Sequence, residues 1–155
     1  MILGIDHVGL LTDDPRAVGA HLAALGMRRT EEGNADGYRV ACEFWRAPTG
    51  GPAIELVTPL DEQSITTGHL ARKGPGLYHV AFEVDDLECE RDRLRTNGFA
   101  VVDRTPCSGA LPGMHVTFLY LGGPANLLVE LVHYAERGGF TEGSNPVPAT
   151  DGAPS

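Results

Sequence analysis

Two histidines and two glutamates recur at matched places along the chain. His7 lies in segment 4–10 (GIDHVGL), and His79 lies in the similar segment 76–82 (GLYHVAF). Glu55 lies in the run IELV and Glu130 in the run VELV, and the two glutamates are separated by nearly the same number of residues as the two histidines. A duplicated module explains both spacings.

The alternation of side chains along a strand predicts that these four residues share a surface. Successive side chains of a strand point to opposite faces, so Val80, Phe82 and Val84 form an apolar face and His79 points the other way. The other three residues also alternate with apolar neighbours. Singly, each could be a hydrogen-bonded or solvated residue, but their matched recurrence favours one site on the concave face of a sheet.

Two imidazoles and two carboxylates form a ligand set that suits a borderline or hard divalent metal ion. Zn, Co, Ni, Mn and Fe(II) all fit these residue types, and the sequence leaves the choice among them open. We therefore predict one divalent metal ion held by His7, Glu55, His79 and Glu130.

Helix signals follow the first strand of each repeat. The pairs Asp13-Asp14 and Asp85-Asp86 supply N-caps. In the first helix Val18, Leu22 and Leu25 have the spacing of a buried stripe, and Gly26 is placed to end it. The second helix carries Leu87 and Leu94 and should end near Gly98.

Strand character returns after each helix, which predicts an α+β fold of two tandem βαβββ modules forming a curved mixed sheet around the metal site. The expected later strands are 38–45, 53–57, 101–102, 114–121 and 127–133. The chain divides into one domain, 1–135, with module one at about 1–60, a linker at about 61–75 and module two at about 76–135. The tail, 136–155, is rich in Gly, Pro, Ser and Thr and too poor in apolar residues to fold alone.

Composition narrows the class of partner. The formal net charge of -9 opposes nucleic-acid binding, and no apolar run approaches the roughly 20 residues that span a bilayer. The N-terminus has no signal-peptide pattern, which favours a cytoplasmic location. Three cysteines without CxxC spacing are expected to be free thiols. A small-molecule substrate is the remaining expectation.

With these stretches the sequence resembles the vicinal-oxygen-chelate superfamily (glyoxalase, bleomycin-resistance and dioxygenase proteins), and it is most similar to the methylmalonyl-CoA epimerase branch. The resemblance runs from about 5 to 132 and is carried by IDHVG, IELVTPL, GLYHVAFEVDD and LVELV. It implies that His7, Glu55, His79 and Glu130 are the metal ligands. It also implies a homodimer and a catalytic carboxylate that aligns with Glu43.

The resemblance implies a metal-dependent epimerase that moves a proton at the carbon next to a carbonyl, with Glu43 and Glu130 as the catalytic pair. Epimerases of this branch typically carry a basic residue after the stretch Phe118-Leu119, where this chain reads FLYLGGPAN. The substrate is therefore expected to be either methylmalonyl-CoA-like or a cyclic polyhydroxy ketone such as a valiolone. A glyoxalase I-like lyase and a non-catalytic drug-binding resistance protein are the alternatives.

Overall fold

The computed structural model describes residues 1–135, which contain nine strands and three helices. The first module comprises β1 (Ile2–Leu11), α1 (Pro15–Ala24), β2 (Arg28–Ala35), β3 (Val40–Arg46) and β4 (Ala53–Pro59). A short helix, α2 (Thr67–Lys73), follows it. The second module comprises β5 (Gly76–Val84), α3 (Leu87–Thr96), β6 (Ala100–Val101), β7 (Cys107–Ser108), β8 (Met114–Leu121) and β9 (Leu127–Tyr134).

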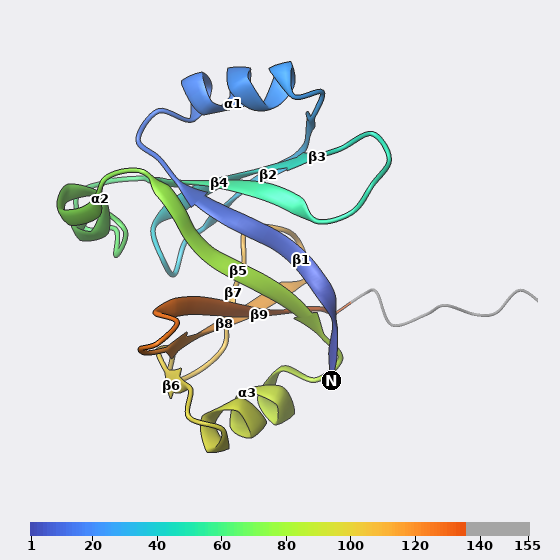
Figure 1. The fold of residues 1–155 in the computed structure, drawn as a ribbon, viewed down its shortest axis with the longest axis vertical. Helices are drawn as coiled ribbons and strands as arrows, with labels where there is room; N and C mark the ends of the chain where they lie inside the picture. Colours follow the sequence, from blue (N-terminus) through green and yellow to red (C-terminus); the bar gives the residue numbers. More distant parts are fainter. Residues whose placement is uncertain (136–155) are drawn as a thin grey trace, which may run out of the picture.

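All nine strands form one curved sheet with α1 and α3 on its outer side, α1 over the first module and α3 over the second (Figure 1). The strand order is β2-β3-β4-β1-β5-β9-β8-β6, and β7 pairs with β8. This mixed, unclosed sheet confirms the predicted α+β fold.

The first strands of the two modules meet antiparallel at the centre of the sheet. In the β1–β5 ladder Val8 pairs with Val80, His7 with Ala81, and Gly9 with His79. These pairings exchange equivalent positions of the two repeats, so the modules are related by a local two-fold axis near the Val8–Val80 pair. β1 also pairs in parallel with β4, and β5 pairs in parallel with β9. The four strands that carry the predicted ligands are therefore adjacent.

The helix caps follow the sequence prediction, whereas one member of the predicted stripe does not. Asp14 accepts a hydrogen bond from the backbone N–H of Ala17 (3.0 Å), and Asp86 accepts one from Cys89 (2.9 Å). Leu22 is buried, but Leu25 is 77% exposed. Leu25 is the C-cap residue, and the chain turns away at Gly26 (φ 86°) before this side chain can reach the sheet.

Two apolar clusters hold the sheet in shape, one on each face. The cluster under α3 uses the face that carries Phe82 and Val84, as the alternation predicts, and consists of Val84, Leu87, Leu94, Leu119, Val129 and Leu131. The second cluster lines the concave face and includes Leu11, Phe44, Val57, Val116 and Val132. Side chains on the concave face are thus packed around the site rather than open to water.

The region between the modules contains a helix that the sequence analysis treated only as linker. α2 has no buried residue, and Leu70 is its one apolar side chain packed against the inner cluster. One apolar contact in seven residues gives no periodic stripe to detect. Strand β2 was also not assigned a range from the sequence, since most of its residues are polar and exposed. The predicted tail lies outside the described residues, and among those described no helix is long and apolar enough to cross a membrane.

Candidate metal centre

The four predicted ligands converge from four adjacent strands. His7 comes from β1, Glu55 from β4, His79 from β5 and Glu130 from β9, and all four are buried. The register explains the convergence: Gly9 of β1 lies between Glu55 and His79, and Ala81 of β5 lies between His7 and Glu130. Small residues at these two positions leave space above the strands for the larger side chains.

The nitrogen and oxygen atoms of this cluster lie close to one another. The Nε2 atoms of His7 and His79 are 3.1 Å apart. The Oε2 atom of Glu55 lies 3.2 Å from the His7 nitrogen and 3.1 Å from the His79 nitrogen, and that of Glu130 lies 3.0 and 2.8 Å from them. Ligand atoms about 2.1 Å from a common ion and at right angles around it would be about 3.0 Å apart. The cluster therefore fits one divalent ion.

Two buried polar atoms of the cluster have no hydrogen-bond partner among the described residues. They are Oε2 of Glu55 and Nδ1 of His79. Oε2 of Glu55 lies 3.2 and 3.1 Å from the His7 and His79 nitrogens but without the geometry of a hydrogen bond. A cation between the four side chains would coordinate this oxygen, which is a second observation in favour of a metal site.

The charges of the cluster are strongly coupled. Burial would lower the pKa of His79, but the neighbouring Glu130 and Glu55 carboxylates outweigh it and raise the pKa to about 9. Burial would also lower the pKa of His7, but Glu55 and Glu130 raise this pKa well above its usual value. Burial would raise the pKa of both glutamates, but the two histidines lower it. Without a metal the site thus holds two carboxylates and protonated imidazoles, and a cation can replace those protons.

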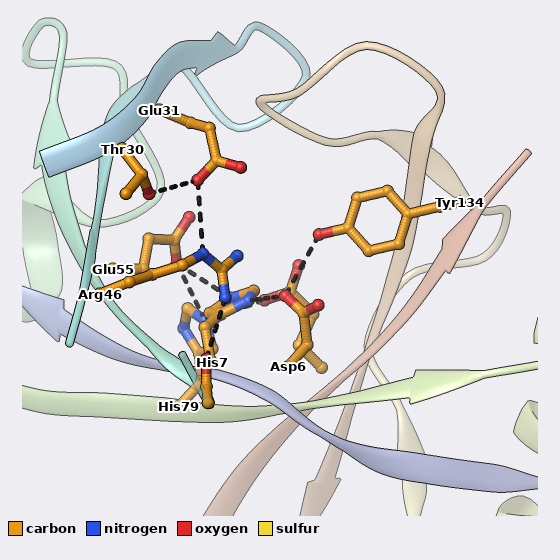
Figure 2. Close-up of polar contacts among 10 residues, drawn as sticks. Asp6, His7, Thr30, Glu31, Arg46, Glu55, His79 and Tyr134 are labelled. Carbon is orange, nitrogen blue, oxygen red and sulfur yellow. Dashed lines mark hydrogen bonds and ion pairs between the residues drawn. The ribbon is translucent and has the colours of Figure 1, made fainter. Parts of the chain in front are cut away.

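The His7 ring is held in place by a carboxylate at its Nδ1 atom, on the side away from the cluster. Nδ1 of His7 lies 2.7 Å from Oδ2 of Asp6, which also accepts a hydrogen bond from the Tyr134 hydroxyl (3.2 Å) (Figure 2). A carboxylate behind a metal-binding histidine fixes the ring orientation and raises its basicity. Tyr78 occupies the repeat position that corresponds to Asp6, so His79 does not have the same anchor.

A cavity of about 90 Å³ opens onto the cluster. Glu55, His79 and Glu130 form its polar inner end, and Tyr38 and Asp103 supply further polar atoms. The remaining wall is mostly apolar and includes Ala35, Val40, Cys42, Val57, Ile65, Met114, Val116, Phe118 and Leu128. A polar, charged end in an otherwise apolar pocket is the usual arrangement of a small-molecule site.

Comparison with known proteins assigns this arrangement to a family. The model of the Glyoxalase/Bleomycin resistance protein/Dioxygenase superfamily matches residues 6–118. The chain belongs to this superfamily.

The similar members of the superfamily include epimerases. An ethylmalonyl-CoA/methylmalonyl-CoA epimerase of Cereibacter sphaeroides is 31% identical over 134 residues, which cover 84% of this chain and 98% of that protein. The crystal structure of methylmalonyl-CoA epimerase from Mycobacterium tuberculosis is 30% identical with a TM-score of 0.77, covering 86% of this chain and 89% of the other. The structure of a Streptomyces coelicolor methylmalonyl-CoA epimerase in complex with 2-nitronate-propionyl-CoA is 26% identical with a TM-score of 0.76. The match covers 87% of this chain and 99% of the other. The prediction of an enzyme of the epimerase class in this superfamily is confirmed by these relatives.

Glu43, the other predicted catalytic carboxylate, lies apart from the cluster in this superfamily member. On β3, Phe44 pairs with Glu55, so the adjacent Glu43 emerges on the opposite face of the sheet, where it pairs with Leu56. Its oxygens accept hydrogen bonds from Trp45 Nε1 (3.0 Å) and Arg29 Nη1 (3.3 Å). The structure therefore does not bring Glu43 to the pocket.

The sequence analysis assigned no chemistry to two polar residues of the pocket, Tyr38 and Asp103. The Tyr38 hydroxyl donates a hydrogen bond to Oδ2 of Asp103 (2.8 Å), and the backbone N–H of Phe118 donates to the same oxygen (2.7 Å). Tyr38 belongs to the first module and Asp103 to the second, and neither lies in a repeated stretch. Their pairing gives no signal in the sequence because it depends on how the outer strands of the two modules fold toward each other.

Proposed function

We propose that this protein is a metal-dependent epimerase that moves the proton at the carbon next to the thioester carbonyl of an acyl-CoA of the methylmalonyl-CoA type. The observation that carries the proposal is the buried cluster of His7, Glu55, His79 and Glu130 at the end of an apolar pocket. The similarity to methylmalonyl-CoA epimerases supplies the substrate class.

The four residues would hold one divalent ion among Zn, Co, Ni, Mn and Fe(II). Bound there, the ion would supply Lewis-acid stabilisation of the negative charge that develops on a carbonyl oxygen when the neighbouring carbon loses its proton. Glu130 reaches the inner end of the pocket as an ionised carboxylate, because the two histidines lower its pKa. In this proposal Glu130 exchanges a proton with the substrate carbon.

The size of the cavity limits what the protein encloses. About 90 Å³ is well below the roughly 300–1,000 Å³ of a pocket that surrounds a drug-sized ligand. Only the acyl end of a CoA thioester would enter, and the nucleotide would remain outside. The apolar wall would keep water from the reacting carbon.

Positive charge near the pocket is compatible with a nucleotide outside it, although the chain is acidic overall. Helix α2 ends with Arg72 and Lys73, and its His69 ring contacts the ring of the pocket residue Tyr78, with centroids 5.1 Å apart. Stretch 118–126 has no basic side chain. In this proposal the phosphate groups of CoA bind to the basic side chains of α2.

The test also includes the cyclic ketone and the substrate of a glyoxalase as comparison compounds. The relatives named above are epimerases of CoA esters, so methylmalonyl-CoA is tried first. A glyoxalase would share the metal cluster but would act on a glutathione adduct. A drug-binding protein of this fold would bind without exchanging protons.

Proton exchange in D₂O tests the proposal directly. Metal-loaded protein is incubated separately with methylmalonyl-CoA, a valiolone-type ketone and the hemithioacetal of glutathione and methylglyoxal, and deuterium uptake is followed by NMR. We expect deuterium at C2 of methylmalonyl-CoA and loss of this exchange after chelation. Exchange only with another substrate would reassign the substrate class, and exchange with none would reject the epimerase.

A further inference from the structure

Epimerisation needs a second proton-transfer group besides Glu130. One group must remove the proton from one face of the carbon, and another must return a proton to the opposite face. The following argument rests on the proposed function. Among the described residues that line the pocket, four titratable groups lie outside the ligand set: Tyr38, Cys42, Tyr78 and Asp103.

Three of these groups are poorly placed or poorly matched to this task. Tyr38 and Tyr78 end in phenol hydroxyls and Cys42 in a thiol, and such groups are ordinarily protonated near neutral pH. Cys42 also lies on the ligand side of the pocket, two residues before Phe44, which pairs with Glu55. Asp103 is the one carboxylate of the four.

Asp103 is held so that one of its oxygens is fixed and the other is available. Oδ2 accepts hydrogen bonds from the Tyr38 hydroxyl and the Phe118 N–H, at 2.8 and 2.7 Å. Within residues 1–135, no protein group donates a hydrogen bond to Oδ1. Two donors on Oδ2 stabilise the carboxylate and orient its second oxygen, as in carboxylates that act as catalytic bases.

The position of Asp103 complements that of Glu130. Phe118 pairs with Glu130 across the β8–β9 ladder, where neighbouring strands are about 4.8 Å apart. The Phe118 ring packs edge-on against both the Tyr38 ring and the His79 ring, with centroids 5.3 Å apart in each case. Phe118 therefore separates the Tyr38–Asp103 pair from the metal cluster along one wall of the pocket.

We propose that Asp103, held by Tyr38 and the Phe118 N–H, is the second proton-transfer group of the pocket and acts on the face of the substrate carbon opposite Glu130. In one direction Glu130 takes the proton from carbon, and the electron pair of the C–H bond moves to the carbonyl to form an enolate. Asp103, protonated on Oδ1, then gives its proton to the other face as the carbonyl reforms. In the reverse direction the ionised Asp103 takes the proton and protonated Glu130 returns one.

The test is Asp103→Asn, assayed with each C2 epimer of methylmalonyl-CoA in D₂O. Asparagine keeps the shape and can still accept from Phe118 N–H, but it cannot carry the proton. We expect epimerisation to fall by about 100-fold or more. We also expect deuterium uptake to persist for the epimer served by Glu130 and to be lost for the other. Asp92→Asn on the exposed side of α3 is the matched control, with unchanged rates expected.

A second variant separates proton transfer from a structural role. Tyr38→Phe removes one donor from Oδ2 but leaves the Asp103 carboxylate able to carry a proton. Deuterium exchange should then slow for the epimer served by Asp103 and stay unchanged for the epimer served by Glu130. Bound metal and Tm are measured for every variant.

The outcomes are distinguishable. Retained epimerisation in Asp103→Asn would reject Asp103 as a proton carrier. An equal loss of exchange for both epimers would also reject it. If this equal loss came with reduced metal content, Asp103 would have a structural role in joining the two modules. If the wild-type protein exchanges neither epimer, the proposed function fails and this assignment fails with it.

Discussion

A carboxylate in a strand changes its surroundings completely when it moves by one position. Phe44 lies opposite Glu55 and faces the pocket, so Glu43 faces α1, where Trp45 and Arg29 bind its oxygens. The resemblance identifies the strand that carries this carboxylate, but a change of register by one residue moves the side chain to the other face. The catalytic role of Glu43 stays a prediction, and the geometry argues against it.

Replacing Glu43 with glutamine distinguishes the two interpretations. If Glu43 only joins β2 to β3, Glu43→Gln should retain turnover within about two-fold and lose at most about 1 kcal/mol of stability, because its pair with Arg29 is solvent-exposed. Turnover with methylmalonyl-CoA, metal content and Tm are the measurements. Abolished turnover with intact metal content would instead restore Glu43 to the mechanism.

The four ligands could be found from the sequence because they repeat and because each alternates with apolar residues that form the opposite face of its strand. Duplication fixes the spacing, and alternation fixes the face. Asp103 and Tyr38 have neither signal. Their contact joins positions 65 residues apart through a turn and a loop, and such contacts follow from the curvature of the sheet.

At the scale of elements, the pairing of β1 with β5 decides whether the ligands can meet. Gly9 lies directly opposite His79, and a Cβ atom at Gly9 would lie 2.3 Å from Cε1 of the His79 ring. The imidazole therefore lies across the backbone of β1. A glycine is needed here so that the His79 ring can lie against the strand, not for a turn.

Gly9→Ala should displace His79 and weaken metal binding. We expect a loss of about 1–3 kcal/mol of stability from overpacking, together with a metal content below one ion per chain after dialysis. Gly4→Ala on the same strand is the matched control, because a Cβ at Gly4 meets no atom within 4 Å. Differential scanning fluorimetry and metal analysis measure both effects. A full metal complement in Gly9→Ala would show that the ring can move without cost.

Elements with a periodic apolar pattern were predictable, and elements without one were not. α1 and α3 carry apolar residues at helical spacing after an Asp N-cap, and both formed as predicted. α2 and β2 are formed mainly by exposed residues, so their positions depend on contacts with the rest of the protein. Leu25 matched the helical period, but the helix ended before that period could bury it.

At the scale of the whole molecule, the cluster joins the two modules. One histidine and one glutamate come from each, so the contacts of His7 with Glu130 and of His79 with Glu55 form only when the modules are folded against each other. The pKa of His79 is about 9 in the folded, metal-free protein and about 6.5 in the unfolded chain. This raised pKa contributes stability that is fully present below pH 6.5 and is lost as the pH rises through about 9.

The metal-free protein should therefore lose stability between pH 6.5 and 9, on the order of 3 kcal/mol if His79 alone accounts for the change. A bound divalent ion should reverse this trend, because metal and protons compete for the same imidazole nitrogens and the competition weakens as the pH rises. The difference in Tm between metal-loaded and chelator-treated protein should thus be larger at pH 9 than at pH 6.5. His79→Gln removes one of the two titrating imidazoles and should weaken the pH dependence of Tm in both the metal-loaded and the chelator-treated protein, whereas His21→Gln on the exposed surface of α1 should leave it unchanged. A difference in Tm that is independent of pH would show that the metal does not bind at His79.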